Sequence, residues 1–461
     1  MADDDRSPEE EFQELMRQLL GSSGGDLDPE QLSALSGLQL DPATIATIMK
    51  QLQGAFVSAQ GKQGIDWELT KRQALHLANQ SGRGITDGQS SELSSAFQLA
   101  GLWLSDATTV PELTDAPRAM TRGQWVEATL PVWQELAEPV ATSFADAFAR
   151  TMREQVPEEM QGIVESASRL IRGVGGPLFA TQLGHVVGRL SGEVVSGGDV
   201  GIPVMPAGVA AILPQNFADF GEGLGLDDDQ LALYLATREL AHARLFRHAK
   251  WLRLHVIAQV TESARGTLID TEPLEELAAG FDPSRPEELR GMIERGDLLR
   301  RSQEGQAALT RLENLLATIE GWVEVVTTDA TARLPSAERI AEAVRRRRAV
   351  GGPAEQALGS LVGLTLRPRR MREASAMWRA VTDAVGVEAR DALWDYPDFM
   401  PTAEDIDDPA ALVERLRARA RGEEPARDAM DDALEALLSG DLPEAGGDGG
   451  SDAGPEDPRP V

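Results

Sequence analysis

The sequence predicts a mainly α-helical fold of the α+β class with a small β-sheet, and three observations support this prediction. Apolar residues recur at helical spacing through most of the chain, and strand signals are confined to 204–214. Neither a repeat with an obvious period nor a long heptad pattern is present. With 461 residues to bury a core, we expect one helical domain over 31–420, in which residues up to about 120 could form a helical N-terminal subdomain.

Both ends of the chain are acidic and lie outside this predicted domain. Residues 1–30 hold ten acidic residues and two arginines, and residues 421–461 hold twelve acidic residues and three arginines. Segments of this composition bury too little apolar surface to fold alone, so we expect two acidic disordered tails. The second tail contains a short amphipathic helix candidate at 428–438, for which a docking motif is the alternative to solvated disorder.

The composition excludes several classes of site. The absence of cysteine rules out disulfides, thiolate metal sites and cysteine nucleophiles. No apolar run approaches the roughly 20 residues of a membrane span, and no signal peptide is recognisable. The net charge of −31 argues against binding to nucleic acid or to a membrane surface. We therefore expect a cytoplasmic protein, and nothing in the sequence indicates its oligomeric state.

Capping residues and apolar spacing predict the order of the helices. A loop is expected over 105–122, which is rich in Thr, Pro and Asp. Before it we expect helices over 10–20 and beginning near 41 and 66, and after it helices that begin near 121 (continuing past Pro139), at 158–172 and at 179–190.

Residues 173–217 differ from the rest of the chain because glycine is frequent and the strand signals lie here. The segments 204–206 and 208–214 are the two strand candidates. Neither GxGxxG nor GK[ST] occurs, so the glycines do not form a phosphate-binding loop. Further along the chain we expect helices at 227–249, 251–260 (after a bend at 250–251), 286–298, 303–328 and 408–421.

The helix at 227–249 carries the most informative residues. At about 100° per residue, Arg238 and His242 fall on one apolar stripe and Glu239 lies beside it. Charged and polar side chains in an apolar stripe are costly to bury unless they pair with one another or bind a ligand. This helix is therefore the candidate functional element.

The residues Arg238 to His242 have the spacing of the HExxH motif with its first histidine replaced. In HExxH two histidines bind zinc and the glutamate activates a water molecule. Glu239 and His242 keep the general-base and second-ligand positions, whereas Arg238 has no free lone pair and is no ligand. Two alternatives stay open: an altered metal site, or a buried ion-pair network of Arg238, Glu239 and His242.

Other candidate groups also have two interpretations. Glu320 shares a helix face with Glu313 and Glu324, which predicts either a solvated acidic face or a carboxylate ligand projecting into the site. His248 lies about 240° round the helix from His242, so a straight helix keeps it away from the same metal. The basic clusters at 345–348 and 367–370 indicate solvated helix faces or internal salt bridges, because aromatic residues are not interleaved with them.

Several sequence blocks, in the same order, resemble one known family. The resemblance covers about 67–408 and is to a zincin-like family of zinc-dependent metallopeptidases or hydrolases found chiefly in actinobacteria, with one branch associated with deazaflavin cofactor biosynthesis. The blocks are Trp125-Val-Glu-Ala-Thr-Leu-Pro-Val-Trp133, Gly176-Pro-Leu to Gly184, Arg238-Glu-Leu-Ala-His242-Ala-Arg-Leu-Phe246, Trp251-Leu-Arg, Glu320-Gly-Trp322 and Leu364-Thr-Leu-Arg-Pro-Arg-Arg.

The resemblance implies a helix-rich zincin-like fold, a zinc cofactor and a peptide or protein substrate. It implies Glu239 as general base, with His242 and Glu320 as metal ligands. The chain departs from the family at Arg238, and Glu320-Gly-Trp322 stands where part of the family has EGH. Two protein ligands fall short of the three of a catalytic zinc site.

Two functional hypotheses follow from the residues and the resemblance. The first is a metallopeptidase, in which Arg238 or Arg244 holds an oxyanion or a substrate carboxylate. The second is a catalytically inactive binding or regulatory protein with a buried polar network.

Overall fold

The structure, a computed structural model, describes residues 65–155, 176, 179–269, 299–362 and 370–423. The tails and the helices expected at 10–20, near 41, at 158–172 and at 286–298 lie outside these residues. The helices are α4 (Trp67–Gln80), α5 (Asp87–Ala107), α6 (Arg122–Gln155), 179–190, α8 (Pro214–Gly221), α9 (Asp228–His248), α10 (Lys250–Arg265), α13 (Gln303–Ala330), α14 (Ala337–Val350), α15 (Pro353–Val362), α16 (Met371–Asp391), α17 (Ala403–Asp407) and α18 (Pro409–Ala420).

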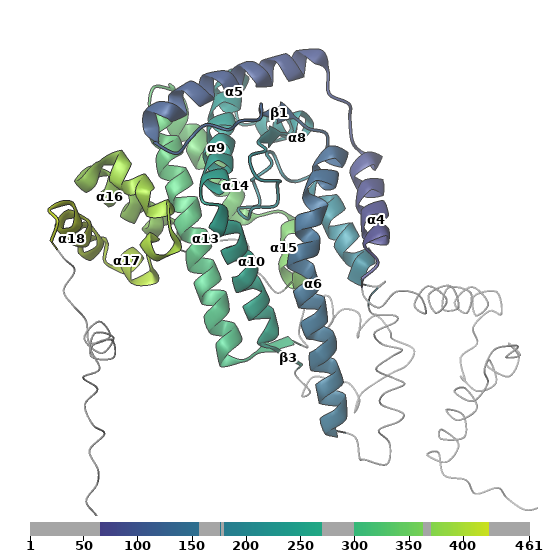
Figure 1. The fold of residues 1–461 in the computed structure, drawn as a ribbon. Coiled ribbons are helices and arrows are strands. Elements are labelled where there is room, and N and C mark those ends of the chain that lie inside the picture. The colour runs from purple at the N-terminus through teal and green to yellow at the C-terminus, as the bar shows by residue number, and fades with distance from the viewer. Residues whose placement is uncertain (1–64, 156–175, 177–178, 270–298, 363–369, 424–461) are drawn as a thin grey trace, which may run out of the picture.

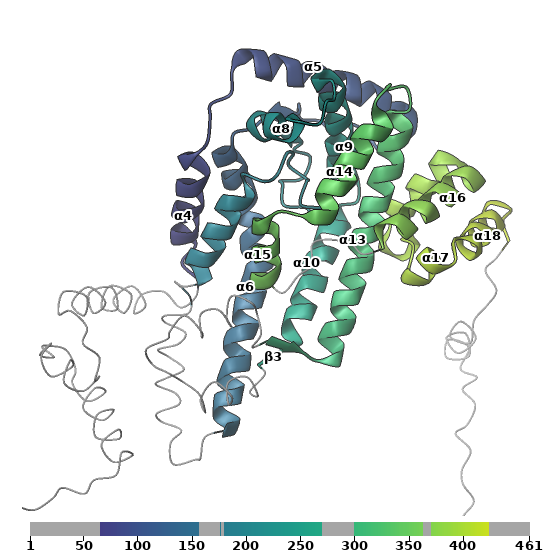
Figure 2. The ribbon, with the colours of Figure 1, turned by 180° about the vertical axis from the view of Figure 1, so that it is seen from behind.

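The helices form a bundle around α9, α10 and α13. Figure 1 shows α6, α10 and α13 side by side, with α5 crossing one end of the bundle. α5 packs against α9 and α13, α4 packs against α6, and α16 joins α13 to α18. Seen from behind in Figure 2, α14 lies over α9, and these two helices are in contact. The helix-rich fold class that the sequence predicts is confirmed.

The helix α9 is buried along most of its length. Its N-cap, Asp227, accepts hydrogen bonds from two backbone N–H groups of the first turn, and Asp228 and Asp229 lie at the positive end of the helix dipole. Every residue from Leu233 to Phe246 is buried. A helix buried on all sides must supply a partner for each of its polar side chains.

Two small sheets accompany the helices in the described part of the chain. β1 (Arg118–Ala119) pairs in parallel with β2 (Ala211–Ile212), and β3 (Thr267–Ile269) pairs antiparallel with β4 (Leu299–Arg301). β2 lies inside the strand candidate 208–214, whereas 204–206 forms no strand. The parallel pair places the segment before α8 against α9.

The helix 179–190 approaches α4 closely because two glycines face it. A side chain at Gly184 would lie 2.7 Å from the carbonyl oxygen of Thr70, and one at Gly188 would lie 2.8 Å from that of Ala74. His185 hydrogen-bonds with Gln73 of α4. Within the described residues, no helix combines the length and apolar character needed to cross a bilayer.

Candidate functional site

Glu239 projects from α9 into a cradle of backbone N–H groups. Gly198 and Ala211 donate to its two carboxylate oxygens at 2.8 and 3.0 Å. A Cβ atom at Gly197 would lie 2.7 Å from one of these oxygens, so the glycine permits the close approach. Burial raises the pKa of Glu239 to about 7, although the two backbone donors favour the ionised form.

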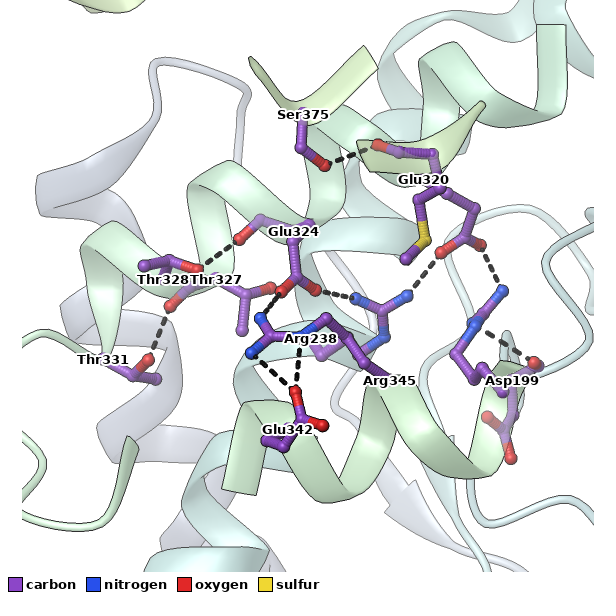
Figure 3. Close-up of polar contacts among 12 residues, drawn as sticks. Asp199, Arg238, Glu320, Glu324, Thr327, Thr328, Thr331, Glu342, Arg345 and Ser375 are labelled. Atoms are coloured by element: carbon purple, nitrogen blue, oxygen red, sulfur yellow. Dashed lines mark hydrogen bonds and ion pairs between the residues drawn. The ribbon is translucent and has the colours of Figure 1, made fainter. Parts of the chain in front are cut away.

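Arg238 points toward the helix α13 and not toward the backbone groups that contact Glu239. Figure 3 shows its guanidinium between Glu320, with which it forms an ion pair, and Glu324, at 3.3 Å. Burial would lower the pKa of Arg238, but Glu320 and Glu324 raise it above its ordinary value, so the group stays charged. The sequence suggested an ion-pair network in which Arg238 pairs with Glu239. This pairing is wrong, because Glu239 contacts backbone donors instead.

The helix α14 contributes further cations to the same cluster. Arg348 lies 3.1 Å from the second oxygen of Glu320, and Arg345 lies 2.9 Å from Glu324. Burial would raise the pKa of Glu320, yet Arg348 and Arg238 hold it below its ordinary value. The solvated acidic face predicted for α13 is therefore wrong for Glu320 and Glu324, which are buried. Of the two alternatives for the basic cluster 345–348, these contacts match internal salt bridging.

Two arginines of α14 hold the loop 191–210 in place over α9. Arg347 pairs with Asp199 at 2.7 Å, and Arg348 donates to the backbone carbonyl of Asp199 at 3.3 Å. Burial would raise the pKa of Asp199, but the two arginines and the N–H of Val195 lower it to about 2. No pattern in the sequence marks Asp199. The spacing of three between Arg345 and Arg348 places both on one face of α14, which is the signal that both contact the glutamates of α13.

His242 lies under the same loop. Gly198 faces its imidazole so closely that a Cβ atom there would collide with the ring, and the ring of Phe246 packs against it with centroids 4.8 Å apart. Its Nε2 atom is buried and makes no hydrogen bond to any described residue. Burial lowers the pKa of His242 to about 4, so the ring is neutral near neutral pH.

The remaining candidates lie away from this cluster. Arg244 points to α5, where it donates to the hydroxyl of Ser105 and the carbonyl of Gly101, both at 3.2 Å. His248 pairs with Asp395 at 3.0 Å. The structure therefore brings Arg238, Glu239, His242 and Glu320 into one buried region and leaves Arg244 outside it.

The donors present do not fit a catalytic zinc ion. His242 and Glu320 are the two candidate ligands, and both oxygens of Glu320 already face guanidinium groups, of Arg238 and Arg348. In the described part of the chain, no group of three or more His, Asp or Glu side chains could hold a metal. A catalytic zinc site needs three such ligands, and positive charges at their oxygens oppose a cation.

The three residues of the altered motif and its carboxylate, Glu239, His242 and Glu320, are also closed to solvent. Glu239, His242 and Glu320 expose only 2%, 7% and 1% of their surface. Two surface cavities of about 480 and 420 Å³ are lined by α4 and by α14 with the loop before α9, and neither lining includes these residues. Glu239 is therefore covered, in part by the loop 191–210, whose Gly198 contacts its carboxylate.

Comparison with known proteins identifies the family. A family model described as zincin-like metallopeptidase matches residues 65–413. A search of curated proteins gave no match. The crystal structure of "a putative hydrolase with a novel fold" from Chloroflexus aurantiacus shares the fold, with a TM-score of 0.52 and 20% sequence identity over 77% of this chain and 99% of that chain. Because the family model spans most of the chain and includes α9 and α13, the chain belongs to the zincin-like metallopeptidase family.

Proposed function

We propose that this chain is a zincin-fold binding or regulatory protein that does not cleave peptides. One observation carries the proposal: Glu320, the carboxylate that would bind zinc, forms ion pairs with the guanidinium groups of Arg238 at one oxygen and Arg348 at the other. An arginine at the first position of the motif offers no lone pair to a metal, and its charge repels one. The burial of Glu239 under the loop 191–210 agrees with a site that no substrate enters.

The test is elemental analysis of untagged protein purified without chelators, together with a broad peptide-hydrolysis screen. We expect far less than one zinc per chain and no hydrolysis above background. The matched control is Glu239→Gln, which keeps the shape of the side chain but removes the proposed general base. Hydrolysis by the wild type that disappears in this variant would overturn the proposal.

A second candidate function is a metal-dependent hydrolase acting on peptides or proteins. It is favoured by the buried Nε2 atom of His242, which lacks a hydrogen-bond partner among the described residues, and by the pKa of Glu239 of about 7, which suits a general base. This function requires about one zinc per chain in the wild type, lost in His242→Ala and in Glu320→Ala. The same elemental analysis therefore separates the two functions.

A further inference from the structure

The carboxylate of Glu320 faces two positive charges, as a carboxylate that binds a divalent metal ion also does. Arg238 faces one carboxylate oxygen and Arg348 faces the other, and Glu320 exposes 1% of its surface. Each arginine also has a second acceptor, Glu324 for Arg238 and the backbone carbonyl of Asp199 for Arg348. Two guanidinium groups carry the same total charge as one divalent ion.

We propose that Arg238 and Arg348 take the place of the zinc ion, and that they mask a latent metal site which the single substitution Arg238→His would uncover. The inference rests on the proposed function, since it assumes that the wild type holds no zinc. In the wild type the two guanidinium groups link the elements as a bound metal ion would, because their ion pairs connect α9 and α14 to the buried carboxylate of α13.

The helix geometry supports the latent site. Positions 238 and 242 are four residues apart on α9 and so lie on one face, one turn from each other. The side chain at 238 already reaches Glu320, because its guanidinium contacts that carboxylate. Replacing the long arginine by the shorter histidine would remove the cation and add a third candidate ligand to His242 and Glu320, which is the number that a catalytic zinc site needs.

One ring nitrogen of His242 is available for this role. Its Nε2 atom is buried without a hydrogen-bond partner among the described residues, so a bound ion would satisfy it. Arg348 would remain beside Glu320 in the variant and would weaken zinc binding by its charge.

The experiment measures zinc per chain, after gel filtration of the full chain, and zinc affinity by competition with a chromogenic chelator. We expect about one zinc per chain in Arg238→His and none in the wild type. The controls are Arg238→Ala, which removes the cation without adding a ligand, and the double variant Arg238→His with His242→Ala; neither should take zinc. Adding Arg348→Gln to Arg238→His should tighten binding by ~10-fold, because a like charge leaves the site.

The outcomes separate this inference from the proposed function. About one zinc in the wild type would overturn the proposed function and the inference with it. A folded Arg238→His variant that takes no zinc, beside a zinc-free wild type, would overturn the inference alone.

A second measurement tests the cationic role if Arg238→His does not fold. The melting temperature should fall in Arg238→Met, which leaves Glu320 and Glu324 with fewer partners, and it should recover in part in Arg238→Met with Glu324→Gln, which removes one of the two charges. An unchanged melting temperature in Arg238→Met would show that Arg238 does not act through its charge.

Discussion

Glu239 is a carboxylate enclosed by backbone donors, and its protonation state sets the cost of burying it. The ordinary pKa of 4.5 is raised to about 7 by burial. A group that holds its proton more tightly in the folded state than in the unfolded state stabilises the fold at low pH and loses that contribution as the pH rises. For Glu239 the loss runs from 4.5 up through about 7.

The substitution Glu239→Gln should remove the loss of stability that ionisation of Glu239 causes as the pH rises. Relative to the variant, the free energy of unfolding of the wild type should fall by about 3 kcal/mol between about pH 4.5 and about pH 8, since each pKa unit corresponds to roughly 1.4 kcal/mol. The variant carries a constant cost as well, because its amide N–H₂ faces a backbone N–H of Gly198 or Ala211. Urea unfolding of both proteins at about pH 5 and about pH 8 measures the difference.

The titration of His242 changes the free energy of unfolding with pH in the opposite direction, but it contributes equally to both proteins and so does not affect their difference. Its pKa is lowered from 6.5 to about 4, so its contribution is lost as the pH falls through that range. Both proteins contain His242, and only Glu239 differs between them. Parallel pH curves for the two proteins would contradict the raised pKa of Glu239.

At the residue scale, the sequence predicted that Arg238, Glu239 and His242 are buried but could not predict their partners. Adjacent helical residues point about 100° apart, so Arg238 and Glu239 face different neighbours. Arg238 pairs with residues more than 80 positions away on α13, and Glu239 accepts from the backbone of a loop. Such pairings depend on how helices pack, which periodicity within one helix does not contain.

At the scale of elements, the glycines of the loop 191–210 allow it to lie directly on α9. Gly198 faces the ring of His242 with no room for a Cβ atom. The ring is itself fixed by Phe246 on the same helix. The fit of this loop therefore depends on residues without side chains at its points of contact.

Gly198→Ala should destabilise the fold by about 1–3 kcal/mol, the usual cost of forcing extra atoms into a packed interior. The matched control is Gly84→Ala, where a Cβ atom would meet nothing within 4 Å. That change should stay within about 0.5 kcal/mol. Urea unfolding of both variants measures the costs, and an equal effect at the two positions would contradict the close contact between the loop and His242.

The elements differ in how far the sequence predicts them. α6, α9 and α13 were predicted because capping residues and long apolar stripes mark them. α5 was missed, since its serines weaken the helical pattern, although the capping box of Thr86 and Gln89 marks its start. β1 and β2 have two residues each, too short for any alternation, and their pairing joins segments more than 90 positions apart.

At the scale of the whole molecule, Asp391 joins three parts of the bundle. At the end of α16, it accepts hydrogen bonds from the indole of Trp322 on α13 at 2.9 Å and from the hydroxyl of Thr108, after α5, at 2.7 Å. It also pairs with Arg390, which is buried and 2.8 Å away. The stacked rings of Trp378 and Trp394, with centroids 5.4 Å apart, fill the region around this junction.

Asp391→Ala should therefore destabilise the whole bundle, by about 3–5 kcal/mol, because it leaves the buried charge of Arg390 without its carboxylate and the donors of Trp322 and Thr108 without an acceptor. The control is Asp395→Ala, which breaks the half-exposed pair with His248 and should cost at most about 1 kcal/mol. Urea unfolding followed by tryptophan fluorescence and by circular dichroism measures both variants. If α16 is coupled to α5 and α13 as these contacts imply, the two probes will shift together in Asp391→Ala; transitions that do not coincide would mean that the bundle does not unfold as one unit.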